Sequence, residues 1–146
     1  MSNHLKEKIV KIEELLERLA LQSAKSIPIV VEGKNDVDAL RKLAICGDIV
    51  AAKTKKSFLA LATELEKLPD TEEVILLLDF DRRGKEWTKR LTQYLERTNV
   101  KPNTFYWQEL GSLVSKDVKD VESLLPYLHT LLKKTSDSQT IIESNL

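Results

Sequence analysis

The sequence has little cysteine, histidine, glycine or proline, and these shortages exclude several classes of protein. Its 146 residues include one cysteine and two histidines, so an internal disulfide is impossible and a Cys/His zinc site lacks ligands. Four glycines and four prolines exclude collagen-like and low-complexity chains. The single Cys46 lies in the apolar stretch LAICGD, where we expect a small buried side chain.

Long hydrophobic runs and an excess of one charge are also missing. No stretch approaches the roughly 18 consecutive apolar residues that a membrane span needs. The N-terminal segment alternates charged and aliphatic residues, unlike a signal peptide. We therefore expect a soluble, cytoplasmic protein with no membrane partner. Because 23 basic residues balance 23 acidic ones, any binding to nucleic acid must depend on local clusters of charge.

What remains is an alternation of strands and helices. Apolar residues recur at helical spacing over residues 4–23, which predicts an amphipathic helix. We expect this helix to pack on the flank of the domain, because it has barely enough heptads for a coiled-coil dimer seam. The sequence divides into this helical segment (1–25), one domain (26–133) and a flexible polar tail (134–146).

Within the domain, short β-branched or aromatic runs predict four strands, each followed by a helix. The expected strands are 27–31, 48–53, 73–79 and 103–108, and the expected helices are about 35–45, 57–68, 85–98 and 121–134. This alternation predicts a single α/β domain, Rossmann-like, with a four-stranded parallel sheet flanked by helices. In such a sheet the carboxyl ends of the strands share one edge, where ligands bind.

Acidic residues gather at that edge. Glu32 ends the first strand, Asp79 ends the third, and Asp117 and Asp120 follow the fourth. Buried carboxylates are costly, and several together raise each other's pKa values. A divalent cation removes this cost, and hard oxygen ligands suit Mg²⁺ or Mn²⁺. Asp81, just past the end of the third strand, can turn towards the same ion as Asp79.

Each of these acids also has an ordinary structural interpretation. Asp81 could instead cap the helix that follows it, and Asp36 could cap the helix after the first strand. Glu32 could belong to a simple turn with a local ion pair to Lys34. Seven basic residues surround the acids and are candidates for holding a phosphodiester, although each alone could be a solvated surface charge: Lys34, Lys53, Lys55, Lys56, Arg82, Arg83 and Lys85.

Two stretches, IVVEGKNDVDAL and VILLLDFDRRG, resemble the Toprim domain. This domain is shared by type IA and II topoisomerases, bacterial-type primases, overcoming-lysogenization-defect nucleases, ribonucleases that mature ribosomal RNA, and recombination-mediator proteins. Its hallmark is a strand-terminal glutamate followed by glycine, here Glu32 and Gly33, then an Asp-x-Asp motif, here residues 79–81. Gly84 stands where a downstream glycine is usual, and the resemblance covers about residues 27–132.

The resemblance implies roles for individual residues. Glu32, Asp79 and Asp81 would bind Mg²⁺ and form the catalytic set. Asp36, four residues after the glutamate, would help to hold a second ion. Either Asp117 or Asp120 would supply a further acid.

Two functional hypotheses follow. The first is a metal-dependent nuclease or related phosphotransferase that acts on RNA or DNA, in RNA processing or DNA repair. The second is a non-catalytic nucleic-acid-binding or adaptor module. A primase-like nucleotidyltransferase is a weaker alternative because no template-holding subdomain is found, and the tyrosines lie within expected helices and strands, which argues against a topoisomerase. The partners expected are RNA or DNA, with a homodimer or a larger processing complex as the assembly.

Overall fold

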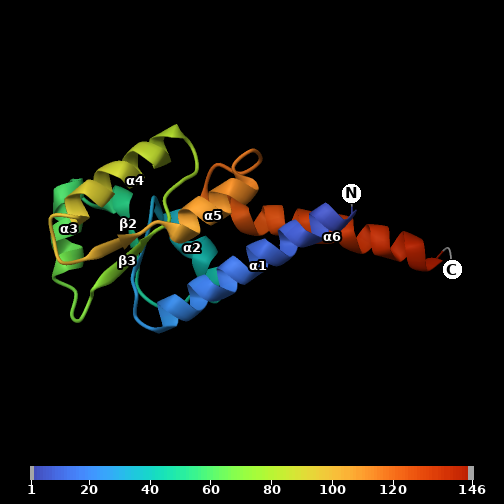
Figure 1. The fold of residues 1–146 in the computed structure, drawn as a ribbon, viewed down its shortest axis with the longest axis horizontal. Coiled ribbons are helices and arrows are strands. Elements are labelled where there is room, and N and C mark those ends of the chain that lie inside the picture. Colours follow the sequence, from blue (N-terminus) through green and yellow to red (C-terminus); the bar gives the residue numbers. More distant parts are fainter. Residues whose placement is uncertain (1, 145–146) are drawn as a thin grey trace.

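The computed structural model describes residues 2–144, and the side chains of residues 3–135. Four strands form one parallel sheet in the order β2-β1-β3-β4 (Figure 1). They are β1 (Ile29–Val31), β2 (Ile49–Ala51), β3 (Glu73–Leu76) and β4 (Lys101–Asn103). The six α-helices are α1 (Ser2–Ala24), α2 (Lys34–Lys42), α3 (Phe58–Glu66), α4 (Arg82–Leu95), α5 (Phe105–Val114) and α6 (Leu124–Ser144), and two short 3-10 helices are η1 (Ala52–Thr54) and η2 (Val121–Ser123). The predicted four-stranded parallel sheet flanked by helices is confirmed.

Helices cover both faces of the sheet because the chain reverses its direction across the strands. It leaves β1 for β2 through α2, then returns past β1 to β3 through α3, and right-handed crossovers put these two helices on opposite faces. Alternate strand residues serve the two cores. Val30 and Leu76 pack with α3 and α4, whereas Ile29, Val31 and Ile75 pack with α1, α2, α5 and α6.

The N-terminal helix belongs to the core of the second face. The apolar residues of α1 that repeat at helical spacing are buried, namely Ile9, Ile12, Leu15, Leu16 and Leu19. The helix contacts α5 and α6. The prediction that it packs on the flank of the domain is therefore confirmed, and this face of the helix is not free to form a dimer seam.

The fourth strand was predicted in the wrong place. Residues 105–114 form α5, and β4 precedes them at Lys101–Asn103. Aromatic residues favour strands in isolation, but here Tyr106, Leu110 and Val114 recur every four residues and are all buried in the core. Packing of this helical face outweighs the local preference. The acids expected after strand four consequently follow α5.

Smaller differences concern the ends of elements. The helix α4 begins at Arg82, three residues earlier than expected, and α6 continues to Ser144, past residue 134 where we placed the start of the tail. The flexibility of residues 134–146 stays a prediction. Cys46 is exposed rather than buried, because it lies in the loop between α2 and β2 and not in either element.

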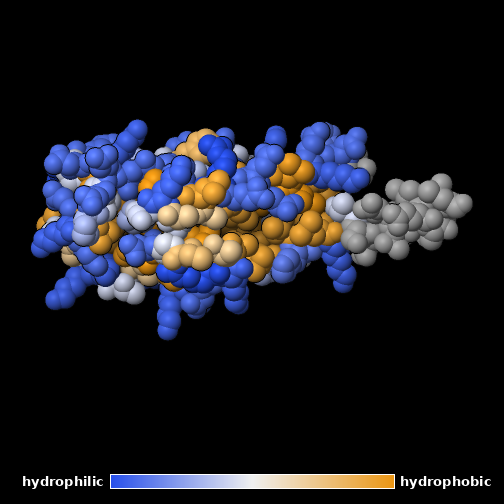
Figure 2. Space-filling view, turned by 90° about the horizontal axis from the view of Figure 1, so that it is seen from below, coloured by the Kyte–Doolittle hydropathy of each residue, from blue (hydrophilic) through white to orange (hydrophobic). Residues whose placement is uncertain are grey.

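The surface differs between the two ends of the molecule. Figure 2 shows hydrophilic residues over the end that holds α3 and α4, and hydrophobic residues gathered over the helical part. On the helical side Leu16, Leu21, Leu43 and Leu128 line a groove of about 550 Å³. Despite this apolar surface, none of the helices in the described part of the chain has the length and apolar character of a membrane span.

Candidate metal and nucleic-acid site

The two principal acids, Glu32 and Asp79, meet at the ends of β1 and β3, the pair of strands at which the strand order reverses. Glu32 directly follows β1, and Asp79 lies three residues beyond the end of β3. These strands are neighbours in the sheet, and the chain leaves them towards opposite edges, which is where parallel α/β sheets bind ligands. Both side chains are buried, Glu32 at 0% and Asp79 at 8% exposure. The sequence places them 47 residues apart, and the fold brings their carboxyl groups together as predicted.

The two carboxyl groups have few hydrogen-bond partners. Glu32 Oε1 accepts a hydrogen bond from Arg83 Nε at 3.2 Å, but Glu32 Oε2 and Asp79 Oδ1 are buried without a partner. Two ionised carboxylates buried beside each other repel, which favours a proton on one of them. Burial, the hydrogen bond to Glu32, and the charges of Glu32, Asp36 and Asp120 raise the pKa of Asp79 to about 9. A pKa this high keeps the Asp79 carboxyl group protonated at neutral pH.

Contacts from three directions fix the backbone around Asp79. The indole Nε1 of Trp107, on α5, donates to the Asp79 carbonyl at 3.0 Å. The next residue, Phe80, is buried, and its N–H donates to the Lys119 carbonyl at 2.7 Å. The first turn of α4 passes so close that a Cβ on Gly84 would collide with the Asp79 carbonyl. Neither Trp107 nor Lys119 was identified from the sequence, because no motif marks them.

Asp81 caps α4, as one of its two interpretations proposed. Its Oδ1 accepts a hydrogen bond from Gly84 N at 2.7 Å. Its side chain also lines the cleft that holds Asp79. The cap uses one carboxylate oxygen, so a role for Asp81 as a metal ligand stays a prediction.

Asp36 helps to cap α2 from inside the helix and also joins this helix to η2. Gly33 is the N-cap of α2, and Asp36 lies three residues after it, where its Oδ2 accepts from Gly33 N at 3.0 Å. Its Oδ1 accepts from Glu122 N, in η2, at 2.9 Å. Burial raises the pKa of Asp36, and the two backbone N–H groups oppose this effect. The expectation that Asp36 is the N-cap was wrong, and Glu122 is a cleft residue that sequence reasoning missed.

The structure distinguishes between the two acids expected after the fourth strand. Asp120 lines the cleft, caps η2 through Ser123 N at 2.9 Å, and its charge acts on Asp79. Asp117 lies elsewhere: it is 58% exposed, accepts a hydrogen bond from Tyr127 Oη at 3.0 Å, and lies 3.9 Å from Lys8 Nζ. Only Asp120 joins the other acids.

Of the seven predicted basic residues, three line the cleft: Lys34, Lys53 and Arg83. The cleft has a volume of about 410 Å³. The remaining four basic residues do not line the cleft. Lys55 pairs with Glu64 at 2.9 Å and Arg82 lies 4.0 Å from Glu86, while Lys56 and Lys85 are exposed side chains outside the cleft lining.

The donor set fits a hard divalent cation only in part. Within the described residues, no three Asp, Glu, His or Cys side chains form a group that could hold a metal ion. However, Mg²⁺ needs only one or two protein carboxylates, since water and substrate phosphate complete its coordination. The unpartnered oxygens of Glu32 and Asp79 supply these two carboxylates, and a cation would take the place of the proton on Asp79.

Comparisons with known proteins agree with this architecture. The Toprim domain model matches residues 27–107. The UPF0292 protein of Methanosarcina acetivorans is 36% identical over 133 residues, which cover 91% of this chain and 90% of the relative. The UPF0292 protein of Methanocaldococcus jannaschii is 37% identical over 123 residues, covering 84% and 93%.

A solved structure from Aquifex aeolicus has the same fold, with a TM-score of 0.62 over 77% of this chain and 96% of the other, at 24% identity. A Toprim domain indicates a metal-binding role connected with nucleic acids. The matched domain and the two relatives show that the chain belongs to the Toprim domain family, among its UPF0292 proteins.

Proposed function

We propose that this protein is a nuclease that uses Mg²⁺ or Mn²⁺ to cleave phosphodiester bonds of RNA or DNA. The observation that carries the proposal is the buried pair Glu32 and Asp79, in which Glu32 Oε2 and Asp79 Oδ1 have no hydrogen-bond partner. Such a pair is unfavourable in an empty cleft and favourable around a cation. Basic side chains at its margin, Lys34, Lys53 and Arg83, supply the charge that a phosphodiester needs.

Each side chain has a defined task in this proposal. Glu32 and Asp79, after Asp79 has lost its proton, would hold the cation, which when bound stabilises negative charge on the phosphoryl group and the leaving oxygen. Asp81 would orient water from the mouth of the cleft. Lys34 and Lys53 would bind the phosphate oxygens, and Arg83 would join them by exchanging its contact with Glu32 for the substrate.

The test compares acids inside and outside the cleft. Wild-type protein and the variants Glu32→Gln, Asp79→Asn and Asp117→Asn are incubated with single-stranded and structured RNA and DNA, in Mg²⁺, Mn²⁺ or EDTA. We expect cleavage only with metal, a loss of about 100-fold or more for Glu32→Gln and Asp79→Asn, and wild-type activity for Asp117→Asn. Activity that survives in both cleft variants would indicate a contaminant and refute the proposal.

A binding readout accompanies the activity assay. Mg²⁺ or Mn²⁺ should raise the melting temperature of the wild type and of Asp117→Asn, and raise that of Asp79→Asn less, because a bound ion stabilises only the folded state. Equal shifts in all three proteins would place the ion elsewhere.

A binding module without catalysis is the second candidate. It is favoured by the lack of a three-ligand metal group in the described residues and by the ion pair through which Arg83 already neutralises Glu32. It predicts nucleic-acid binding that is independent of metal, with no cleavage of any substrate in the same panel.

A further inference from the structure

Beside the cleft, two aromatic rings and two arginines form a compact surface cluster on α3 and α4. The rings of Phe58 and Trp87 meet edge to face, with centroids 5.4 Å apart at 81°. The guanidinium carbon of Arg83 lies 5.3 Å from the centre of the Trp87 ring, and that of Arg90 lies 4.9 Å from the centre of the Phe58 ring. We call these four residues the aromatic cluster.

The aromatic cluster is directly connected to the carboxylates. Arg83 belongs to both, since it stacks on Trp87 and donates through Nε to Glu32. On α4, Arg83, Trp87 and Arg90 follow one another at intervals of four and three residues, so they share one face of the helix. A chain that leaves the cleft past Arg83 therefore meets Trp87 next and Arg90 after it.

The rings are only half buried. Phe58 and Trp87 rest on the core beneath α3 and α4 and keep part of their surface in solvent, while both arginines are exposed. Half-exposed aromatic rings alternating with cations are the arrangement on which unpaired bases stack, because every base has a π face and carries a phosphate beside it. If the aromatic cluster served only to stabilise α3 and α4, it would have no need to lie beside the cleft.

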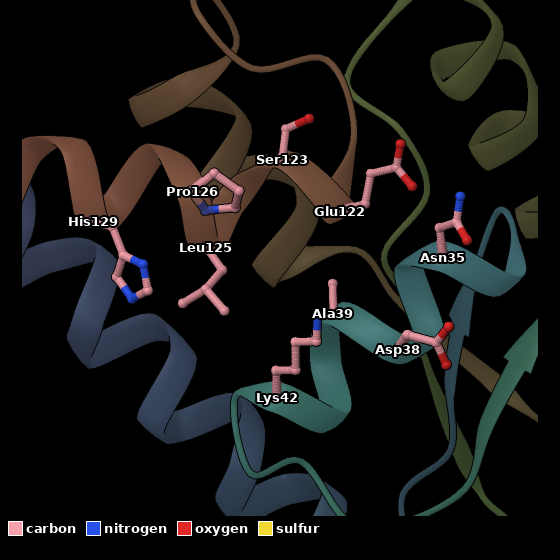
Figure 3. Close-up of a pocket in the computed structure, with 9 residues that line it drawn as sticks. All are labelled: Asn35, Asp38, Ala39, Lys42, Glu122, Ser123, Leu125, Pro126 and His129. Atoms are coloured by element: carbon pink, nitrogen blue, oxygen red, sulfur yellow. The ribbon is translucent and has the colours of Figure 1, made fainter.

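Charge also favours a path over α4. This helix carries five basic residues and one acidic residue, although the whole chain is neutral. On the opposite side of the cleft the lining is acidic, with Asp120 and Glu122. Asn35 and Glu122 also border a second pocket of about 570 Å³, where Asp38 adds a carboxylate and Lys42 a cation (Figure 3). The excess of cations on α4 attracts a polyanion to that helix.

We propose that a nucleotide adjacent to the cleaved phosphate stacks as an unpaired base on Trp87, with Arg90 on the next phosphate, so that the protein selects single-stranded nucleic acid. The inference rests on the proposed function, since it assigns the substrate class of the same cleft. The base takes the face of the indole that Arg83 now covers, and the guanidinium turns to the phosphate. A duplex cannot offer such a base without being unpaired and unstacked.

The experiment separates binding from cleavage by working in EDTA. Binding of fluorescently end-labelled 12-nucleotide single strands of RNA and DNA, and of the corresponding duplexes, is measured by anisotropy for Trp87→Leu and Arg90→Gln. The matched controls are Tyr94→Leu, in the last turn of the same helix, and Arg97→Gln, just past its end, where the guanidinium carbon lies 5.6 Å from the centre of the Tyr94 ring. Circular dichroism establishes that each variant is folded.

We expect Trp87→Leu to weaken single-strand binding about tenfold, Arg90→Gln to weaken it several-fold, and the two controls to change it less than about twofold. Wild-type protein should bind duplexes more weakly than single strands. In addition, 5-iodouridine placed along the strand should crosslink to Trp87 in the wild type, which keeps the test decisive if Trp87→Leu does not fold. Crosslinks confined to other residues, or folded Trp87→Leu with wild-type affinity, would overturn the proposal.

The two proposals fail differently. Unchanged affinity in Trp87→Leu together with metal-dependent cleavage would refute the stacking site and leave the nuclease. Weakened single-strand binding in Trp87→Leu, with no cleavage under any metal, would refute the nuclease and leave the stacking site as part of a binding module.

Discussion

Asp79 determines how the cleft responds to protons and to cations. Its carboxyl group faces Glu32 in a buried setting and has no donor for its Oδ1, and its pKa of about 9 means that it is protonated in the folded protein at neutral pH. In the unfolded chain the same group ionises near its ordinary pKa of 3.8. The folded state therefore binds one proton more than the unfolded state between those two values.

The sign of the resulting pH dependence follows directly. Because the folded state holds the extra proton, the free energy of unfolding should fall as pH rises from about 4 to about 9 and level off above it. One proton gives a slope of at most about 1.4 kcal/mol per pH unit. Urea titrations in EDTA at pH 5.5, 7.0 and 8.5 should show this decline in the wild type and a flatter profile in Asp79→Asn. Parallel profiles in the two proteins would contradict the raised pKa of Asp79.

The beginning of α4 positions the acids of the second motif. Asp81 caps the helix through Gly84 N, and Gly84 lets the first turn lie against the Asp79 carbonyl with no room for a Cβ. Glycine is needed at position 84 because a side chain would not fit, and not because of its backbone conformation, since no glycine in the described chain has a positive φ. The same helix continues with Arg83, Trp87 and Arg90, so its placement also fixes the aromatic cluster.

Two glycine substitutions test this placement. Gly84→Ala should destabilise the fold by about 2 kcal/mol, because the added methyl overlaps backbone atoms and outweighs the better helix propensity of alanine. Gly33→Ala is the matched control in the same cleft: its Cβ would lie 3.7 Å from Lys53 Cδ, an ordinary contact, so the cost should stay below about 1 kcal/mol. Chemical denaturation measures both, and equal costs would contradict the steric argument.

The elements differ in how far the sequence could predict them. Continuous β-branched runs bounded by acids identified β1 and β3, and hence the meeting of Glu32 and Asp79, because parallel-sheet topology leaves few alternatives. The helix α5 was missed because its aromatic residues favour a strand locally, and only burial of Tyr106 and Leu110 in the core beside α1 and β3 decides otherwise. Contacts through backbone atoms, such as Glu122 N to Asp36, leave no trace in side-chain patterns.

At the scale of the whole molecule, cations are concentrated on one helix although the total charge is zero. The sheet with α3 and α4 occupies one end, and α1 and α6 extend the other (Figure 1). The cleft cations Lys34, Lys53 and Arg83 and the basic helix α4 lie at the first end. Nucleic acid should therefore approach that end, and the helical end should contribute little to its affinity.

Salt dependence measures how much these cations contribute to binding. Each cation that contacts a phosphate of a single strand contributes about −0.7 to the slope of log Kobs against log salt concentration. We expect Lys53→Gln to reduce the steepness by about 0.7, and Lys11→Gln, an exposed substitution on α1, to leave it unchanged. Anisotropy titrations between 50 and 300 mM salt give the slopes. Identical slopes in wild type and Lys53→Gln would show that Lys53 does not contact a phosphate.

The exposed thiol of Cys46 offers a means of observing how nucleic acid binds to the protein. It is the only cysteine in the sequence, and it lies three residues before β2, at the edge of the sheet where strands begin and opposite the cleft. Arg41 Nη1 steadies its loop by donating to the carbonyls of Ile45 and Gly47. A maleimide dye there labels one position without touching the cleft, and energy transfer to acceptors at the 5′ or 3′ end of a bound strand would report the polarity with which the strand crosses α4.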